Sequence, residues 1–182
     1  MDSIVPNHRP QIGDYPTYYQ NYFSWATDDQ PLLESYQYSI QDGLEFWHGI
    51  RESESEYSYE AGKWTIKELV QHIIDVERVF VYRAMSIARG ESKVLPGFDH
   101  DAYVENSAAN DRSWASLLHE YQHLKQSTFD FFESLNANQW LAKGEIEAGK
   151  VSLLAIAYII VGHDKHHQRI VKERYLAKLR KA

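Results

Sequence analysis

Apolar side chains recur at three- and four-residue steps through most of this chain, and no stretch keeps the two-residue alternation of a β-strand. The clearest case is the stripe formed by Leu33, Tyr36, Ile40, Leu44, Trp47 and Ile50. Such a stripe lies along one face of an amphipathic helix, which must bury that face against a partner. The pattern predicts four long helices, at about residues 31–52, 65–89, 111–135 and 152–179.

The second predicted helix carries explicit signals at both ends. Thr65 and Glu68 have the spacing of a capping box, and Gly90 follows the last apolar position, where a helix commonly ends. Four amphipathic helices without a strand pattern predict an all-α four-helix bundle. Two connections are too long for tight turns: residues 91–110, which would fold over one end of the bundle, and the glycine-bearing residues 140–151, which could form a short hairpin.

Length and composition limit the classes of function. At 182 residues the chain is most simply one domain spanning 1–182. It has no cysteine, which excludes disulfides, thiolate metal sites and cysteine nucleophiles. A net charge of -7 argues against a nucleic-acid partner. With neither a signal peptide nor an apolar run that could span a bilayer, we expect a soluble cytoplasmic protein without a membrane partner.

The N-terminal segment, residues 1–30, is rich in aromatic residues. Its stretch "YPTYYQNYFSW" holds six of them in eleven positions. We expect this segment to wrap onto the bundle. A contact between two copies in a homodimer is the alternative.

Histidines are crowded into "GHDKHHQRI". His163 and His167 are four residues apart, which places them about 40° apart on the helix, close enough to bind one ion, and they share a face with apolar residues. His119 and His123 have the same spacing on the third helix, but they lie opposite its apolar stripe. We therefore interpret His119 and His123 as a hydrated surface pair.

His72 projects from the edge of the apolar stripe of the second helix, so it also faces inward. One inward histidine is more often a hydrogen-bonded core residue than a ligand. Three inward histidines on two helices favour a divalent metal ion, because one ion would satisfy a nitrogen of each ring. Such a site keeps coordination positions free, as a catalytic metal requires. His166 is the rival third ligand, ranked below His167.

A di-iron site was the other metal hypothesis, because di-iron bundles use Glu-x-x-His motifs on two helices. The chain has two such motifs, Glu45 with His48 and Glu120 with His123. Both fail on helical phase: Glu45 lies almost opposite the apolar stripe of its helix, and His123 faces solvent.

With the bundle and the histidines in place, the chain resembles the YfiT-like branch of the DinB superfamily. The resemblance is densest in "GKWTIKELVQHIIDVERVFVYRAMSIARG", "LPGFDHDAYV" and "YIIVGHDKHHQRIVKERYL". It implies an up-down-down-up bundle that binds a divalent metal, here expected to be zinc or nickel, through one histidine of the second helix and an HxxxH pair of the fourth. Those positions are His72, His163 and His167.

The resemblance also suggests an activity. Members of the family include S-transferases that use bacterial thiols such as bacillithiol, and a mycothiol-dependent isomerase. A metal with open positions can turn a bound thiol or water into a nucleophile. The leading expectation is therefore a thiol S-transferase acting on a small molecule with a low-molecular-weight thiol. A metal-dependent hydrolase and a non-catalytic, stress-related metal-binding bundle are the alternatives.

Other polar residues have expected roles near this site. Asp75, one turn beyond His72, could orient an imidazole or act as a general base, or it could simply face solvent or a neighbouring helix. Arg83 lies on the face of His72 and could bind a substrate carboxylate, although a salt bridge to Glu77 or Glu173 is the favoured interpretation. Asp164 is expected to face a neighbouring helix or solvent, and orienting one of the histidines is its lesser alternative. From their place in the 91–110 loop, Asp99, His100 and Tyr103 are expected at the mouth of the site.

Overall fold

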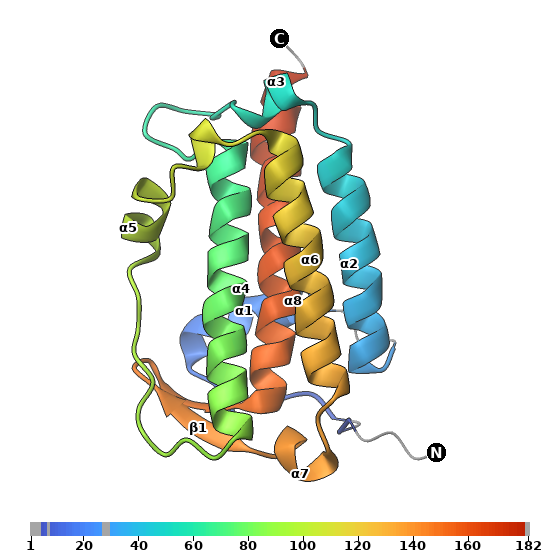
Figure 1. Ribbon diagram of the computed structural model, residues 1–182, viewed down its shortest axis with the longest axis vertical. Helices are drawn as coiled ribbons and strands as arrows, with labels where there is room; N and C mark the ends of the chain where they lie inside the picture. The colour runs from blue at the N-terminus through green and yellow to red at the C-terminus, as the bar shows by residue number, and fades with distance from the viewer. Residues whose placement is uncertain (1–4, 7, 27–29, 181–182) are drawn as a thin grey trace.

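The four long amphipathic stretches form four helices that lie side by side (Figure 1). They are α2 (Leu32–His48), α4 (Ile66–Ala88), α6 (Trp114–Glu133) and α8 (Leu153–Ile170). The computed structural model describes residues 5–6, 8–26 and 30–180. The predicted four-helix bundle is confirmed.

The helices run up, down, down and up, so that α4 and α6 are parallel (Figure 1). Helix α4 packs against α6 and α8, and α2 packs against the same two helices. Because α4 and α6 point the same way, residues 89–113 must return along the length of the bundle. This crossover contains α5 (His100–Glu105) and the 3-10 turn η2 (Ala109–Asp111).

Local side-chain chemistry fixes the helix ends. The capping box at α4 is present: Thr65 Oγ1 accepts the Glu68 amide at 3.1 Å, and Glu68 Oε2 accepts the Thr65 amide at 2.7 Å. Gly90, just past the end of α4, has a φ of 83°, a value at which a β-carbon would be strained. At the starts of α6 and α8, the hydroxyl groups of Ser113 and Ser152 each accept a hydrogen bond from the backbone amide three residues further along.

The predicted helical ranges differ from the structure mainly at their ends. The first range, 31–52, is interrupted after α2, and a short helix α3 (Glu52–Ser55) follows. The fourth range, 152–179, continues beyond α8 through a π-helical turn, η3 (Val171–Leu176), into α9 (Ala177–Leu179). None of the helices within the described part of the chain is long and apolar enough to cross a membrane.

A small sheet closes one end of the bundle, after the short helix α7 (Ala137–Trp140). Strands β1 (Lys143–Ile146) and β2 (Gly149–Ser152) pair antiparallel, with Lys143 opposite Ser152. This is the short hairpin predicted for residues 140–151. Its turn depends on Gly149, whose φ of 125° is rarely adopted by other residues.

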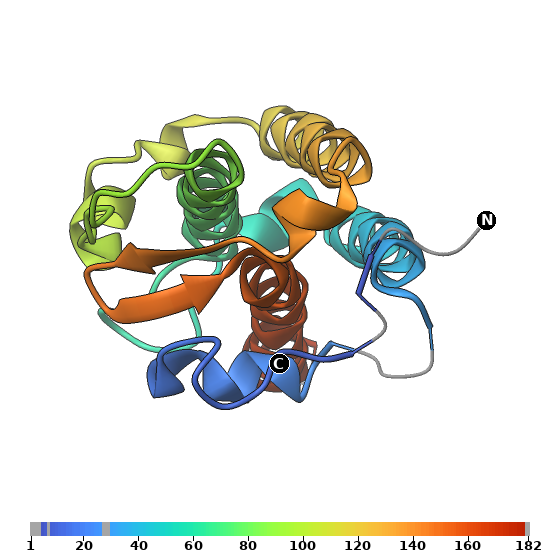
Figure 2. The same cartoon turned by 90° about the horizontal axis from the view of Figure 1, so that it is seen from below.

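Part of the aromatic N-terminal segment packs onto the bundle. Helix α1 (Gln20–Phe23), which follows the turn η1 (Thr17–Tyr19), packs across α8, as the view from below shows (Figure 2). The approach is close because α8 has a glycine there: a β-carbon on Gly162 would overlap the Tyr22 carbonyl oxygen. Residues 1–4, 7 and 27–29 of the predicted segment lie outside the described residues.

A buried polar layer separates two apolar clusters in the core. One cluster includes Phe80, Phe132 and Ile156, and the other includes Trp47, Ile73 and Leu117. Between them, the ammonium group of Lys125 on α6 lies 2.6 Å from Glu77 of α4 and 2.7 Å from Asp164 of α8. These three side chains are almost fully buried.

Two tyrosines complete this layer. Tyr36 of α2 donates a hydrogen bond to Glu77 at 2.9 Å, and Tyr121 of α6 donates one to Asp164 at 2.5 Å. The layer therefore joins all four helices. Tyr121 fits only because α2 has Gly43 opposite, where a β-carbon would overlap the tyrosine hydroxyl.

Replacing Lys125 tests how much the fold depends on this layer. Burial lowers the pKa of Lys125, but Asp164 and Glu77 raise it by more, so the ammonium group stays charged. Lys125→Met leaves two buried carboxylates without their cation, and we expect it to reduce the free energy of unfolding by about 3–5 kcal/mol. Urea unfolding would measure this, with the exposed Lys172→Met as control, expected to change stability by less than about 0.5 kcal/mol. Equal effects of the two substitutions would contradict the proposed importance of the layer.

Candidate metal centre

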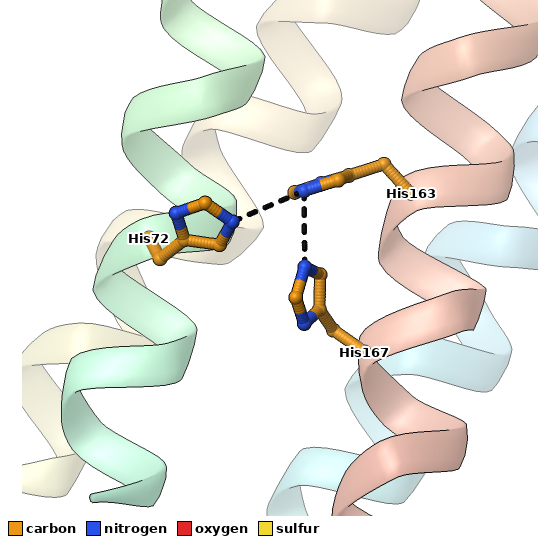
Figure 3. A group of neighbouring side chains, drawn as sticks. All are labelled: His72, His163 and His167. Carbon is orange, nitrogen blue, oxygen red and sulfur yellow. Dashed lines mark hydrogen bonds between the residues drawn. The ribbon is translucent and has the colours of Figure 1, made fainter. Parts of the chain in front are cut away.

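Three histidines from two helices converge at one point (Figure 3). His72 projects from α4, and His163 and His167 project from successive turns of α8. The Nε2 atom of His163 lies 3.2 Å from that of His72 and 3.1 Å from that of His167. One nitrogen of each ring lies within 4.8 Å of those of the other two. All three side chains are buried.

The two short contacts cannot both be hydrogen bonds of neutral rings at the same nitrogen. An imidazole nitrogen offers either one hydrogen or one lone pair in the ring plane. His163 Nε2 can therefore satisfy His72 or His167, but not both. A single cation between the rings would accept a lone pair from each, and ligands bound tetrahedrally at ~2.0–2.1 Å lie ~3.3 Å apart. The spacing and the donor set of the three histidines thus fit a divalent metal ion.

Electrostatics prepares the rings for such a role. Burial lowers the pKa of His72 to about 3, helped by His100. Burial also lowers the pKa of His163 and His167 well below the ordinary value, and in both cases neighbouring histidines add to the effect. At neutral pH all three rings are therefore uncharged. Their lone pairs are available to an ion without release of a proton.

The histidines lie in the wall of a cavity of about 410 Å³. One side of the cavity is the face of α4 that bears His72, Val76 and Phe80, and the crossover supplies Phe98 and His100. A second cavity of about 270 Å³ also reaches the site, and Trp64 and His167 line both. The candidate centre is thus accessible to small molecules.

Comparison with known proteins identifies the family to which this fold belongs. The model of the DinB superfamily matches residues 36–171, which is more than half of the chain. The chain belongs to the DinB superfamily. Its fold resembles a solved structure of YfiT from Bacillus subtilis, with a TM-score of 0.69, 16% sequence identity, and coverage of 94% of this chain and 93% of that one. That protein is described as a probable metal-dependent hydrolase with an unusual four-helix bundle topology. No curated protein matches the sequence significantly.

Aromatic side chains that sequence reasoning did not assign to the site surround the centre of this DinB protein. The Trp64 ring packs 4.8 Å from that of His72, and the Tyr22 ring lies edge-on to His163 at 5.3 Å. Tyr18 and Tyr19 also line the larger cavity. The crowding of tyrosines near the N-terminus was visible in the sequence, but no periodicity related it to the histidines of α8.

Two other residues predicted near the site lie apart from the cluster. His166, the rival ligand, is half-buried and lines the cavity, but it is not part of the converging group. Asp75 is half-buried and accepts a hydrogen bond from Gln71 at 2.9 Å, with Arg78 at 3.7 Å. Burial raises the pKa of Asp75. Its role as a general base or as a partner of an imidazole stays a prediction.

The residues that were excluded as metal ligands because of their helical phase lie away from the three converging histidines. His119 and His123 are exposed on α6, and so are Glu45 and His48 on α2. Glu120 forms an ion pair with Arg78 at 2.6 Å and another with Arg112. Neither Glu-x-x-His motif belongs to the group of converging ligands.

The loop residues fulfil the prediction in part. His100 lines the cavity, with its ring 5.7 Å from that of His72. Asp99 instead caps α5, accepting the amides of Asp101 and Ala102. The Tyr103 ring packs against that of Phe98 at 5.2 Å, and Tyr103 is not among the residues that line the cavity.

The expected salt bridge of Arg83 was wrong. Glu77 pairs with Lys125, and Glu173 pairs with Arg169 at 2.7 Å. Asp164 faces neighbouring helices, as expected, where it contacts Lys125 and accepts hydrogen bonds from Tyr121 and Gln168.

The lowered pKa values predict that acid destabilises the metal-free protein. Below the ordinary value of 6.5, the unfolded chain binds protons at His72, His163 and His167 that the folded chain does not bind. The free energy of unfolding should therefore fall as the pH falls from 6.5 toward about 3, the pKa of His72. Urea unfolding in a chelator at pH 7, 6 and 5 would measure this fall. His72→Gln should make the fall shallower, and an unchanged slope in that variant would contradict the assignment.

Proposed function

We propose that this protein is a metal-dependent enzyme that acts on a small organic molecule, with hydrolysis as its reaction. The observation that carries the proposal is the convergence of three neutral, buried histidines in the wall of a cavity. Three neutral ligands leave the charge of a divalent ion undiminished and leave coordination positions free. The chemistry that such an ion supplies when bound is Lewis acidity and a water whose pKa falls to roughly 7.

The chain's own residues would do the rest. His72, His163 and His167 would hold the ion, with α4 and α8 fixed against each other by the buried ion pairs of Lys125. Trp64 and Tyr22 pack against the rings and shield them from bulk water on two sides. The description of the B. subtilis structure as a probable metal-dependent hydrolase supports hydrolysis as the reaction.

Thiol transfer is the second candidate, and one observation favours it. Two cavities meet at Trp64 and His167, so a cosubstrate and an acceptor could approach His167 from different sides. A chain without cysteine would need an external thiol for this reaction. A reaction with two organic substrates makes use of both cavities, whereas hydrolysis needs only one.

Histidine substitutions test the proposed centre. We expect His163→Ala and His167→Ala each to lose bound zinc or nickel and to lower any hydrolase or transferase activity at least ~100-fold, because each removes a ligand. The proteins should remain folded, since the polar layer and both apolar clusters are intact. Elemental analysis of tag-free protein, circular dichroism and activity assays would measure these effects.

The double variant His119→Ala/His123→Ala is the matched control. It removes two exposed histidines of the same spacing and should leave metal content and activity unchanged. Loss of metal in this control, or unfolding of both site variants, would contradict a catalytic centre at His72, His163 and His167.

The two reactions separate in one assay series. Metal-loaded protein would be given a panel of esters, amides and lactones without thiol, and then an electrophile such as 1-chloro-2,4-dinitrobenzene with and without bacillithiol. We expect turnover in the first set. Turnover only in the second, dependent on the thiol, would replace hydrolysis by thiol transfer.

A further inference from the structure

Arg83 is a buried cation beside the same cavity. It lies on α4, eleven residues beyond His72, and that spacing returns to almost the same face of a helix. His72, Val76, Phe80 and Arg83 all line the cavity. Only 3% of the Arg83 surface is exposed to solvent.

The guanidinium group of Arg83 is only partly satisfied. Its Nη2 donates a hydrogen bond to the Pro96 carbonyl at 2.7 Å. Its central carbon lies over the rings of Phe80 and Phe98, at 5.2 and 5.7 Å from their centres. Its Nε and Nη1 atoms are buried and have no hydrogen-bond partner at normal geometry among the described residues. The Tyr19 hydroxyl also faces the guanidinium group, which lowers the pKa of that tyrosine, although burial raises it by more. A buried charge in this condition is costly unless something else binds it.

The other buried cations of the described chain are paired with carboxylates. Lys125 contacts Glu77 and Asp164, and Lys67 contacts Glu52 at 2.9 Å and Glu56 at 3.0 Å. Across the described residues, no carboxylate oxygen lies within 4.0 Å of the Arg83 guanidinium group.

One carboxylate does line the cavity with Arg83, namely that of Glu147 in the turn of the hairpin. Its side chain is exposed and lies against Gly97, where a β-carbon would overlap the carboxylate. Glu147 therefore occupies the rim of the cavity and leaves Arg83 without a counterion.

We propose that Arg83 binds a carboxylate group of the substrate, so that the protein acts on small organic acids. The inference rests on the proposed function in one respect, because it takes the cavity beside the three histidines as the substrate site. The free Nε and Nη1 hydrogens point along different edges of the planar guanidinium group, and one of them can join the second hydrogen of Nη2 in a planar fork that matches the two oxygens of a carboxylate. Arg83 is also the only lysine or arginine among the described residues that line the cavity, and its single charge balances a monoanion.

The cavity also limits the shape of this acid. Positions 72 and 83 of α4 are separated by ~16 Å along the helix axis, so the carboxylate binds far from the reacting bond. Aromatic rings of Tyr19, Tyr22, Trp64, Phe80 and Phe98 lie along the cavity wall. A flat or aromatic body between the carboxylate and the reacting group fits these walls best.

Binding of a matched pair of probes tests the proposal. 3-Phenylpropanoate and 3-phenylpropanamide differ in charge but hardly in shape. Calorimetry on metal-free protein in a chelator excludes coordination of the acid to a metal ion. We expect the wild-type protein to bind the acid at least ~10-fold more tightly than the amide, because hydrogen bonds to charged groups are the stronger ones. Equal binding of the two probes would overturn the proposal.

Substitutions then assign the preference to Arg83. Arg83→Met should abolish the difference between the probes, and Arg83→Lys, which keeps the charge but not the fork, should reduce it. Arg78→Met is the matched control: Arg78 lies on the same helix but is exposed and paired with Glu120, so the preference should persist. A preference that survives in Arg83→Met would overturn the proposal.

Thermal melting separates binding from structure. Because Arg83 is a buried cation without a counterion, Arg83→Met should melt no lower than the wild-type protein. If both Arg83→Met and Arg83→Lys fail to fold, Arg83 is a structural residue and the proposal is wrong. Loss of the acid preference in a folded variant establishes the subsite even if no hydrolysis is found. Hydrolysis of neutral and acidic substrates at equal rates would instead retain the enzyme and reject the subsite.

Discussion

The contact of the Lys125 ammonium group with Glu77 and Asp164 is the constraint on which the other features depend. Apolar contacts have little direction, so by themselves they specify the rotation of a helix about its axis only loosely. A buried charge specifies it tightly, because each partner that is lost leaves a charge in an apolar medium. With one partner on α4, one on α8 and the tyrosine of α2 bound to Glu77, the rotation of each helix is fixed. Asp164 is the immediate neighbour of His163, so fixing the first toward the core turns the second toward α4.

The candidate site concentrates arrangements that are unfavourable without a ligand. Three uncharged imidazoles meet at one nitrogen that can satisfy only one of two contacts, and the Arg83 guanidinium lies nearby without a counterion. Elsewhere in the described chain, the buried charged side chains Lys67, Glu77, Lys125 and Asp164 have partners of opposite sign. Unfavourable groups gathered at one cavity are expected where a protein gives up stability for binding. The apolar clusters and the polar layer provide the stability that this site uses.

The sequence predicted those features that follow from local periodicity. The four helices, the capping box of Thr65 and the inward phase of His72, His163 and His167 all depend on spacing within one helix, and the structure has them. The polar layer could not be predicted in the same way. Lys125 and Glu77 are charged residues on apolar faces, and only the packing of one helix on another shows that they meet. Tyr22 and Trp64 were missed for a similar reason. Tyr22 contacts His163, which is distant in the chain, and Trp64 contacts His72 although it lies before the start of α4, outside the helical periodicity. The salt bridge predicted for Arg83 failed because Lys125, from a different helix, already occupies Glu77.

The close packing of α1 on α8 has a consequence for how the protein is made. Tyr22 of α1 lies against His163 of α8, so the two can meet only after α8 has been made. During synthesis the N-terminal segment therefore leaves the ribosome without the surface that it covers. The set of three histidines is complete only after residue 167 has left the ribosome. A metal ion held by all three histidines would therefore be acquired only after α8 has been made, and metal loading would report that α4 and α8 have paired.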